Sequence, residues 1–499
     1  MESMDDSQTS PIRDVDVVRG NPGVSPSGLT FDSGSFRDRT ARVFLYRGEV
    51  FRALSTQAAA DWHRISSEAY FERLSSQGHI VRTDELTEVE ARHLPVPISC
   101  AAILRHERIP FVTYPYEWSF SMLRDAALLH LEILTEAVAA GTILKDASPY
   151  NVQFRGSQPV FIDVGSFVPH VAGEPWTGYR QFCEMMLFPL LLQAYRKIDI
   201  QPILRVKMDG ISAREFLRPL SYRDLLRPGV FTHGWLQSML EGQESSAEAN
   251  TISALKSSGF DRRLIQTNLA KLTRVVQQLK WTPDRTQWTR YRHELPHVLR
   301  DAETKTQFVR EVCRTDRRCL VWDLGCNDGH FSRIAAENAD TVLAMDQDHG
   351  CVERLYRELA SEGCRNIVPL CIDLLNPPAA LGWRGRERAR LEHRGLPDLV
   401  LCLGLIHHLV IAGNIPLPEV VDWLASLRAA VVLEFPSKQD PMVRRLLRNK
   451  HDQYDDYSLP RLEAALVENG FQIHNRTVLP SGERTLLHIV PKSSAAGDA

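Results

Sequence analysis

Apolar residues follow two different patterns along this chain of 499 residues. In the C-terminal part, short continuous apolar runs alternate with stretches in which apolar residues recur at helical spacing. Such runs are typical of parallel strands buried on both faces, and their alternation with helices predicts βαβ units in an α/β domain. The expected strands cover residues 321–324, 341–346, 367–373, 399–403 and 429–436, with helices at 330–338 and 351–361. A final hairpin turning at Ser481–Gly482 predicts an antiparallel last strand.

The N-terminal part mixes strand-like and helical patterns, which predicts an α+β domain. A hairpin is expected at residues 43–54, with its turn at 47–49. A long amphipathic helix is expected at 121–140, and it ends before Gly141.

Shifts in composition divide the chain further. The first residues are rich in Ser, Asp, Pro and Gly, a composition typical of disorder, and Trp281-Thr282-Pro283 marks a boundary between the two patterned parts. The expected organisation is a disordered N-terminus at 1–35, an α+β domain at 36–280, an α/β domain at 281–491 and a flexible tail at 492–499.

Composition and charge narrow the possible functions. The formal net charge of −3 gives no reason to expect nucleic acid or an anionic membrane as a partner. The nine cysteines lack the C-x-x-C spacing of a metal site and are expected to be reduced thiols. Because the N-terminus lacks signal-peptide features and no run is long and apolar enough to span a membrane, a cytoplasmic protein is expected.

Acidic residues stand at the ends of three expected strands, at Asp323, Asp346 and Asp373. The carboxyl ends of parallel strands meet at one edge of a sheet, which is where open α/β folds bind ligands. One such aspartate would be unremarkable. Three in succession predict a ligand site at this edge.

The loop DLGCNDG, from Asp323 to Gly329, resembles motif I of the class I S-adenosylmethionine (SAM) methyltransferases. The resemblance implies a Rossmann-like, seven-stranded and mostly parallel sheet. A dinucleotide-binding loop would need G-x-G-x-x-G, which this sequence fails at the third and sixth positions, and a phosphate-binding loop would need a nearby Lys. A degenerate Rossmann-like domain without a ligand is the alternative.

The resemblance also implies a role for each residue of the site. Asp323 would lie near the methionine end of SAM, Asp346 would accept both ribose hydroxyls, and Asp373 would accept the adenine amino group. Glycine permits close approach of backbone and ligand, and asparagine tolerates left-handed backbone at the position where the family usually has glycine. The expected cofactor-binding residues are Asp323, Gly325, Cys326, Asn327, Gly329, Asp346 and Asp373.

Residues 397–410, PDLVLCLGLIHHLV, resemble motif IV of the same family. A histidine beside the methyl group is a reasonable general base, so His407 and His408 are candidates, with one of them facing the pocket. Glu434, at the end of the fifth strand, could orient the acceptor or pair with a cation. The alternative is that both histidines only pack against the cofactor loop.

A helix expected at 287–314 precedes the first strand of this domain. It carries aromatic and basic residues at Trp288, Tyr291 and Lys305. Such a helix either covers a bound cofactor as a lid or simply closes the sheet, and the sequence favours neither.

In the N-terminal domain, LKDASPYN at 144–151 and IDVG at 162–165 resemble the catalytic and metal-binding loops of kinase-like phosphotransferases. Asp146, Asn151 and Asp163 have the matching spacing. Residues 1–144 contain no Lys, however, so the phosphate-binding cation could come only from an arginine, with Arg52 as the candidate, and a degenerate kinase-like domain is expected. Turn-forming Asp and Asn residues are the structural alternative.

The whole arrangement resembles the bacterial NoeA-type nodulation methyltransferases. We expect a SAM-dependent methyltransferase that acts on an oxygen of a small molecule or carbohydrate, with nitrogen as the second choice. The N-terminal domain would bind the acceptor or regulate access, and no metal is expected. The alternatives are a bifunctional methyltransferase and ATP-dependent phosphotransferase, or a scaffold that senses SAM without turnover. The acceptor and the oligomeric state are left open.

Overall fold

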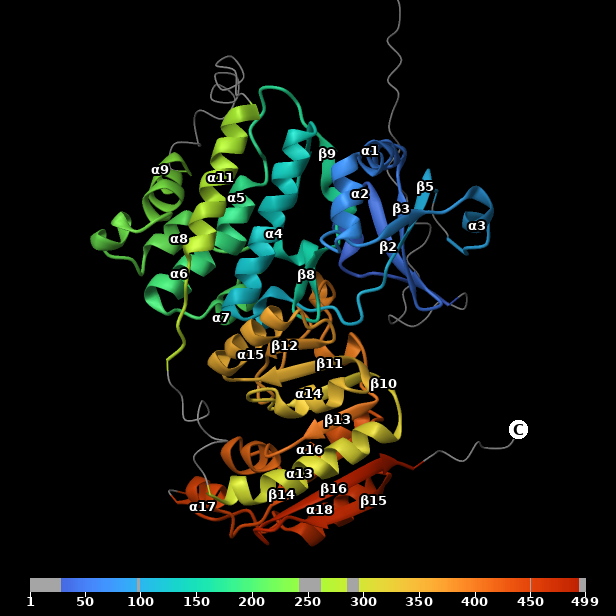
Figure 1. The fold of residues 1–499 in the computed structure, drawn as a ribbon, viewed down its shortest axis with the longest axis vertical. Coiled ribbons are helices and arrows are strands. Elements are labelled where there is room, and N and C mark those ends of the chain that lie inside the picture. The colour runs from blue at the N-terminus through green and yellow to red at the C-terminus, as the bar shows by residue number, and fades with distance from the viewer. Residues whose placement is uncertain (1–27, 97–98, 242–261, 285–295, 449, 493–499) are drawn as a thin grey trace, which may run out of the picture.

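The computed structural model describes residues 28–96, 99–241, 262–284, 296–448 and 450–492. The N-terminal part, blue to green in Figure 1, lies above the C-terminal part, yellow to red. Among the described residues, none of the helices combines the length and apolarity needed to cross a bilayer.

An antiparallel sheet of five strands opens the N-terminal part, in the order β1-β2-β3-β5-β4. Positive φ angles at Arg47 and Gly48 close the β2–β3 hairpin, at the predicted turn, with the backbone that a two-residue turn requires. Strand β1 lies inside the segment for which disorder is expected, whereas residues 1–27 lie outside the described part of the chain. The elements are β1 (Leu29–Phe31), η1 (Ser35–Arg37), β2 (Ala41–Tyr46), β3 (Glu49–Leu54), α1 (Thr56–Ser66), α2 (Ala69–Ser76), β4 (Thr83–Glu85), α3 (Glu88–Arg92) and β5 (Ala102–His106).

Helix α4 (Phe120–Ala139) is the centre of the helical half of this part, and most of its residues are buried. The Ser119 hydroxyl accepts the Met122 N–H at its start, and Gly141, with φ 86°, follows its end. Around it lie η2 (Pro115–Glu117), β6 (Thr142–Leu144), η3 (Pro149–Asn151), β7 (Val152–Arg155), β8 (Gln158–Phe161), η4 (Val164–Ser166), β9 (Phe167–Pro169), α5 (Tyr179–Phe182), η5 (Cys183–Leu187), α6 (Phe188–Arg196), α7 (Ile200–Val206), α8 (Ala213–Leu217), η6 (Tyr222–Leu226), η7 (Val230–Trp235), α9 (Leu236–Glu241) and α11 (Arg262–Gln278).

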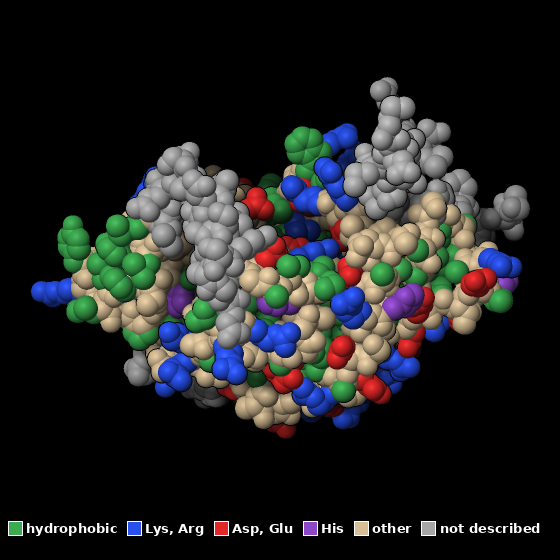
Figure 2. Space-filling view, turned by 90° about the horizontal axis from the view of Figure 1, so that it is seen from above, with side chains coloured by type: hydrophobic (Ala, Val, Ile, Leu, Met, Phe, Trp, Pro, Cys, Tyr) green, Lys and Arg blue, Asp and Glu red, His purple; other side chains and the backbone are tan. Residues whose placement is uncertain are grey.

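The surface of this part carries charges of both signs. Seen from above in Figure 2, Lys and Arg side chains are interspersed with Asp and Glu, and neither sign dominates the face.

The C-terminal part contains a seven-stranded sheet in the order β12-β11-β10-β13-β14-β16-β15. Strand β16 runs in the direction opposite to the other six strands, so the predicted mostly parallel α/β sheet with a final hairpin is confirmed. Its elements are α13 (Pro296–Thr315), β10 (Arg318–Leu324), α14 (His330–Ala336), β11 (Ala339–Asp346), α15 (His349–Glu362), β12 (Ile367–Cys371), η9 (Trp383–Gly385), η10 (Leu391–His393), β13 (Leu399–Cys402), η11 (His408–Ala412), α16 (Leu417–Ser426), β14 (Ala430–Pro436), α17 (Pro441–Leu447), α18 (Leu459–Glu468), β15 (Phe471–Val478) and β16 (Arg484–Pro491).

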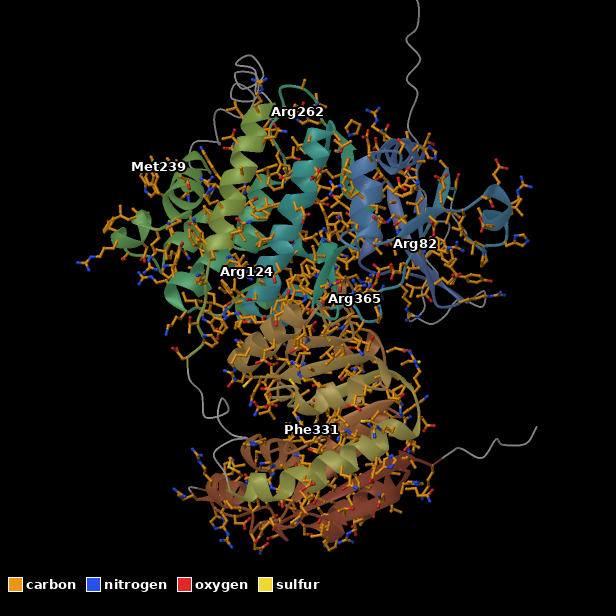
Figure 3. All side chains as sticks on the ribbon, in the orientation of Figure 1. Arg82, Arg124, Met239, Arg262, Phe331 and Arg365 are labelled. Atoms are coloured by element: carbon orange, nitrogen blue, oxygen red, sulfur yellow. The ribbon has the colours of Figure 1, made fainter. Side chains whose placement is uncertain are left out.

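The two parts are packed against each other. The Ser157 N–H and hydroxyl, between β7 and β8, both donate to the Cys364 carbonyl at 3.0 and 2.8 Å. Gly156 has φ 60°, and a Cβ there would lie 2.4 Å from the carbonyl carbon of Arg365, so glycine is required. Figure 3 labels Arg365 at this border. One continuous apolar core includes residues of both parts.

A buried ion pair crosses the same border. Arg394, in the long connection between β12 and β13, lies 2.6 Å from Glu117 of the N-terminal part, and their side chains are 2% and 0% exposed. The guanidinium also lies over the Tyr114 ring, 4.7 Å from its centroid. The pair ties the connection to the N-terminal part, and the loss of one partner would leave a buried charge without compensation.

We therefore expect Glu117→Gln, which keeps the size of the side chain but removes its charge, to lower the free energy of unfolding by ~3 kcal/mol. Denaturant titration followed by tryptophan fluorescence measures the change. Glu88→Gln is the control, because the Glu88–Arg92 pair is exposed. Equal stability of the Glu117→Gln variant and the wild type would contradict the expectation.

Candidate cofactor and catalytic site

A cavity of about 220 Å³ lies at the carboxyl edge of the seven-stranded sheet. Residues from the ends of β10, β11, β12, β13 and β14 line it, together with α13 and the β16 residue Arg484. Parallel pairing places Leu324 opposite Met345 and Asp346 opposite Cys371, so the strand tips meet at this edge. The expected ligand site at the carboxyl edge is therefore a real cavity.

The loop after β10 forms one wall. The Gly325 and Cys326 N–H groups both donate to the Met345 carbonyl, at 2.8 and 2.9 Å, which turns the chain sharply beside the cavity. Asn327 has φ 50°, the left-handed backbone that asparagine was expected to tolerate. Gly329 faces away from the cavity, and a Cβ there would lie 2.5 Å from Leu355, so it allows close packing of the following helix.

Asp346 and Asp373 present carboxylates at the tips of β11 and β12. The Asp346 oxygens accept the N–H groups of Asn327 and Asp348 at 2.9 and 2.8 Å, and a carboxylate has about four lone-pair sites in all. Asp373 Oδ1 accepts the Leu375 N–H at 2.9 Å. Both side chains are thus oriented by backbone groups while they retain acceptor capacity toward the cavity.

Asp323 is the most deeply buried of the three carboxylates, with 2% exposure. The Ser332 hydroxyl donates to it at 2.6 Å. Burial nevertheless raises the pKa of Asp323 to about 7, against the opposing effects of that bond and of the Lys305 charge. A cation placed beside this carboxylate would favour its ionised form.

The two histidines occupy different environments. His408 lines the cavity, whereas His407 is completely buried beneath it, and their ring centroids are 4.1 Å apart. Burial, helped by the charge of Arg484, lowers the pKa of His408 to about 4. Burial holds the pKa of His407 well below its usual range. Of the two, His408 alone faces the cavity, which answers a question that the sequence left open.

Glu434 is held between two cations. Lys305 Nζ lies 2.7 Å from Glu434 Oε2, and Arg484 Nη1 lies 3.1 Å from Oε1. Burial alone would raise the pKa of Glu434, but the charges of Lys305 and Arg484 outweigh it and lower the pKa to about 2. Arg484 also pairs with Asp440 at 2.7 Å. Glu434 is therefore a fixed anion that pairs with cations and is poorly suited to accept a proton.

Two residues of this network carry more than the sequence suggested. Lys305, which the sequence places on the helix before the first strand, reaches Glu434 from α13, and Arg484 reaches it from β16. Nothing in the local sequence pattern marks Arg484, because it reaches the cavity only through the insertion of β16 beside β14. Helix α13 also lines the cavity, as a lid would, while Trp288 and Tyr291 lie outside the described residues.

The kinase-like residues are gathered in the N-terminal part, away from the lining of this cavity. Arg52 on β3 donates to Asp163 at 2.6 Å, and burial and the charge of Asp163 raise the pKa of Asp146. Asn151 ends η3, and its carbonyl accepts the Ile162 N–H at 2.8 Å. The third-strand arginine thus pairs directly with the aspartate of the D-x-G sequence.

The whole chain has a curated relative. The nodulation protein NoeA of Rhizobium meliloti (strain 1021) is 32% identical over 457 residues, which cover 91% of this chain and 94% of that protein. The chain belongs to the NoeA family. Its similarity to NoeA extends across both parts of the structure, so the N-terminal part is a family feature. No protein-family model matches the sequence.

Among solved structures, the N-methyltransferase NodS of Bradyrhizobium japonicum WM9 is 14% identical to this NoeA-family chain. The similarity covers 40% of the chain and 99% of NodS, with a TM-score of 0.29. The magnesium protoporphyrin IX methyltransferase of Synechocystis PCC 6803, solved with bound S-adenosylhomocysteine (SAH), is 19% identical. It covers 41% of the chain and 93% of that enzyme, with a TM-score of 0.30.

The raised pKa of Asp323 predicts a pH dependence of stability in the ligand-free protein. Between its ordinary value of 3.8 and about 7, the folded state binds more protons than the unfolded state. This residue therefore makes the free energy of unfolding fall as pH rises through that window, by at most ~1.4 kcal/mol per pH unit.

In Asp323→Asn, that contribution should vanish, so the variant should gain stability relative to the wild type as pH rises toward 8. Denaturant titrations at several pH values measure it, with the exposed Asp340→Asn as control. Parallel stability profiles for the wild type and Asp323→Asn would refute the shift.

Proposed function

We propose that this NoeA-family protein is a SAM-dependent methyltransferase. The observation that carries the proposal is the cavity at the carboxyl edge, where Asp323, Asp346 and Asp373 project from three successive strands. In this arrangement Asp346 accepts the ribose hydroxyls and Asp373 the adenine amino group. Asp323, whose burial favours the neutral form, gains a counter-charge from the sulfonium end of SAM. SAM supplies an activated methyl group when bound.

The acceptor atom is an oxygen of a small molecule or carbohydrate, with nitrogen as the second choice. Methyl transfer to a hydroxyl requires removal of its proton, and His408 is the histidine among the described residues that line the cavity. Its pKa of about 4 keeps the ring neutral and unprotonated at physiological pH, but it also makes the ring a weaker base than an ordinary histidine. His408 would therefore take the proton as the methyl group is transferred, and not before. Glu434, fixed between Lys305 and Arg484, orients polar groups of the acceptor from the same side.

The N-terminal part is proposed as a degenerate kinase-like domain that binds the acceptor or regulates access. The pair between Arg52 and Asp163 supports a lost phosphotransferase activity, because a carboxylate that should hold a metal ion is instead neutralised by a side chain.

Nine free cysteines suit the proposed cytoplasmic location.

Isothermal titration calorimetry with SAM tests the cofactor assignment. We expect the wild type to bind, and Asp346→Ala to bind about 100-fold more weakly, because two ribose contacts to a charged acceptor are lost. Asp340→Ala is the matched control, since Asp340 lies at the opposite, exposed end of the same strand. Absence of heat with SAM would overturn the proposal, and heat with Mg-ATP would restore the bifunctional alternative.

Incubation of cell extract with isotopically labelled SAM, followed by mass spectrometry, should identify the acceptor by its added methyl group. With that acceptor, His408→Ala should lower kcat by about 10²-fold or more without changing the affinity for SAM. The wild-type rate should fall as pH drops through about 4, because a protonated ring accepts no proton. His393→Ala, on an exposed segment, is the control. Unchanged turnover in His408→Ala would exclude it as the base.

A further inference from the structure

Helix α7 of the N-terminal part lies across the carboxyl ends of β11 and β12. Figure 1 shows it directly above β12 and α15. Asp199, at its start, lies 3.3 Å from His349, the first residue of α15. Gln201 Nε2 lies 3.7 Å from the sulfur of Cys371, the last residue of β12. One helix of the N-terminal part thus contacts the segments that follow two strands of the cofactor site.

Arg205, near the end of α7, makes the most extensive contact. Its guanidinium donates to the Asn376 carbonyl at 2.9 Å, to Asn376 Oδ1 at 3.2 Å and to the Pro377 carbonyl at 2.9 Å. A planar fork with several donors suits such a set of acceptors, whereas a lysine ammonium would satisfy it only in part. The guanidinium therefore fixes both the position and the orientation of this turn.

The turn held by Arg205 continues directly from the cavity wall. Asp373, Leu374 and Leu375 line the cavity, and the Asp373 carbonyl accepts the Asn376 N–H at 3.1 Å. Leu375 is 46% exposed, and the rest of its side chain packs against Gly413. The chain then runs on through the long connection to β13. The Asp373 carboxylate thus adjoins a short turn that Arg205 of the N-terminal part binds from outside the domain.

We propose that Arg205 is a positioning residue for the adenine end of the cofactor pocket, an inference that rests on the proposed SAM binding. By clamping residues 376–377, it holds Asp373 where its carboxylate accepts the adenine amino group. The N-terminal part is then a structural component of the cofactor site. Its contribution reaches SAM through the turn and involves no contact of its own.

A purely architectural role for Arg205 makes a different prediction. An arginine that only joins two parts would affect stability and leave ligand selectivity unchanged. A positioning role affects the discrimination between adenine and a base without its amino group. SAH and S-inosylhomocysteine, in which a carbonyl replaces the amino group, form a ligand pair that separates the two roles.

The experiment is calorimetry of the full-length protein with both ligands. The wild type should prefer SAH, because the Asp373 carboxylate accepts from an amino group and repels a carbonyl. Arg205→Ala should weaken SAH binding about tenfold, equivalent to ~1.4 kcal/mol, and bring the two affinities together. Arg205→Lys should bind SAH with an affinity between those of the wild type and Arg205→Ala. Arg214→Ala, an exposed arginine on α8, is the matched control and should match the wild type.

Each outcome decides a separate point. Thermal unfolding of each variant confirms that it is folded before the affinities are compared. If folded Arg205→Ala binds SAH like the wild type, or keeps the wild-type preference for SAH, the positioning role is overturned while SAM binding stands. If the wild type binds neither ligand, the proposed function fails, and the inference fails with it.

Discussion

The desolvation of a carboxylate is the constraint on which the cofactor site depends. Asp323 sits at the tip of the central strand with 2% exposure and one hydroxyl donor, and burial raises its pKa to about 7. Such a group is costly in the empty protein and favourable once a cation lies beside it. A sulfonium ligand supplies that charge. The site thus favours a cationic ligand because it shields the Asp323 carboxylate from water.

Charges also balance one another at the edge of the cavity formed by Glu434 and its partners. Lys305, Arg484, Glu434 and Asp440 neutralise one another within hydrogen-bonding distance, so no net charge is left to attract or repel an acceptor. Beside them His408 is kept neutral by burial. The cavity therefore combines one edge lined by aspartates with another edge on which the charges balance, as the proposed binding of a cationic donor and a neutral acceptor would require.

Much of this arrangement could be predicted from the sequence. Apolar runs ending in Asp323, Asp346 and Asp373 reveal parallel strands and their common edge, because strand periodicity and the strand-end position of ligand sites are local signals. The sequence could not show which of His407 and His408 faces the cavity, because that depends on how distant segments pack around these two adjacent residues. The role of Arg484 could not be predicted, because it depends on the order of the strands in the sheet, and the spacing of apolar residues does not determine that order.

The contacts between the N-terminal part and the turn after β12 could not be predicted from the sequence either. The spacing of Asp146, Asn151 and Asp163 resembles a motif, whereas the contacts with residues 376–377 come from α7, a short helix without a motif. Arg205 binds mainly backbone carbonyls, and such contacts leave little trace in the sequence of the partner segment.

The buried pair between Arg394 and Glu117 has a consequence for modularity. Arg394, in the connection between β12 and β13 of the C-terminal half, pairs with Glu117 of the N-terminal half. Replacement of the N-terminal half by an unrelated domain would remove this partner. Recombination that joined this half to a foreign partner would strand a charge inside the new junction. The similarity to NoeA covers 91% of the chain and so includes both halves that this ion pair joins.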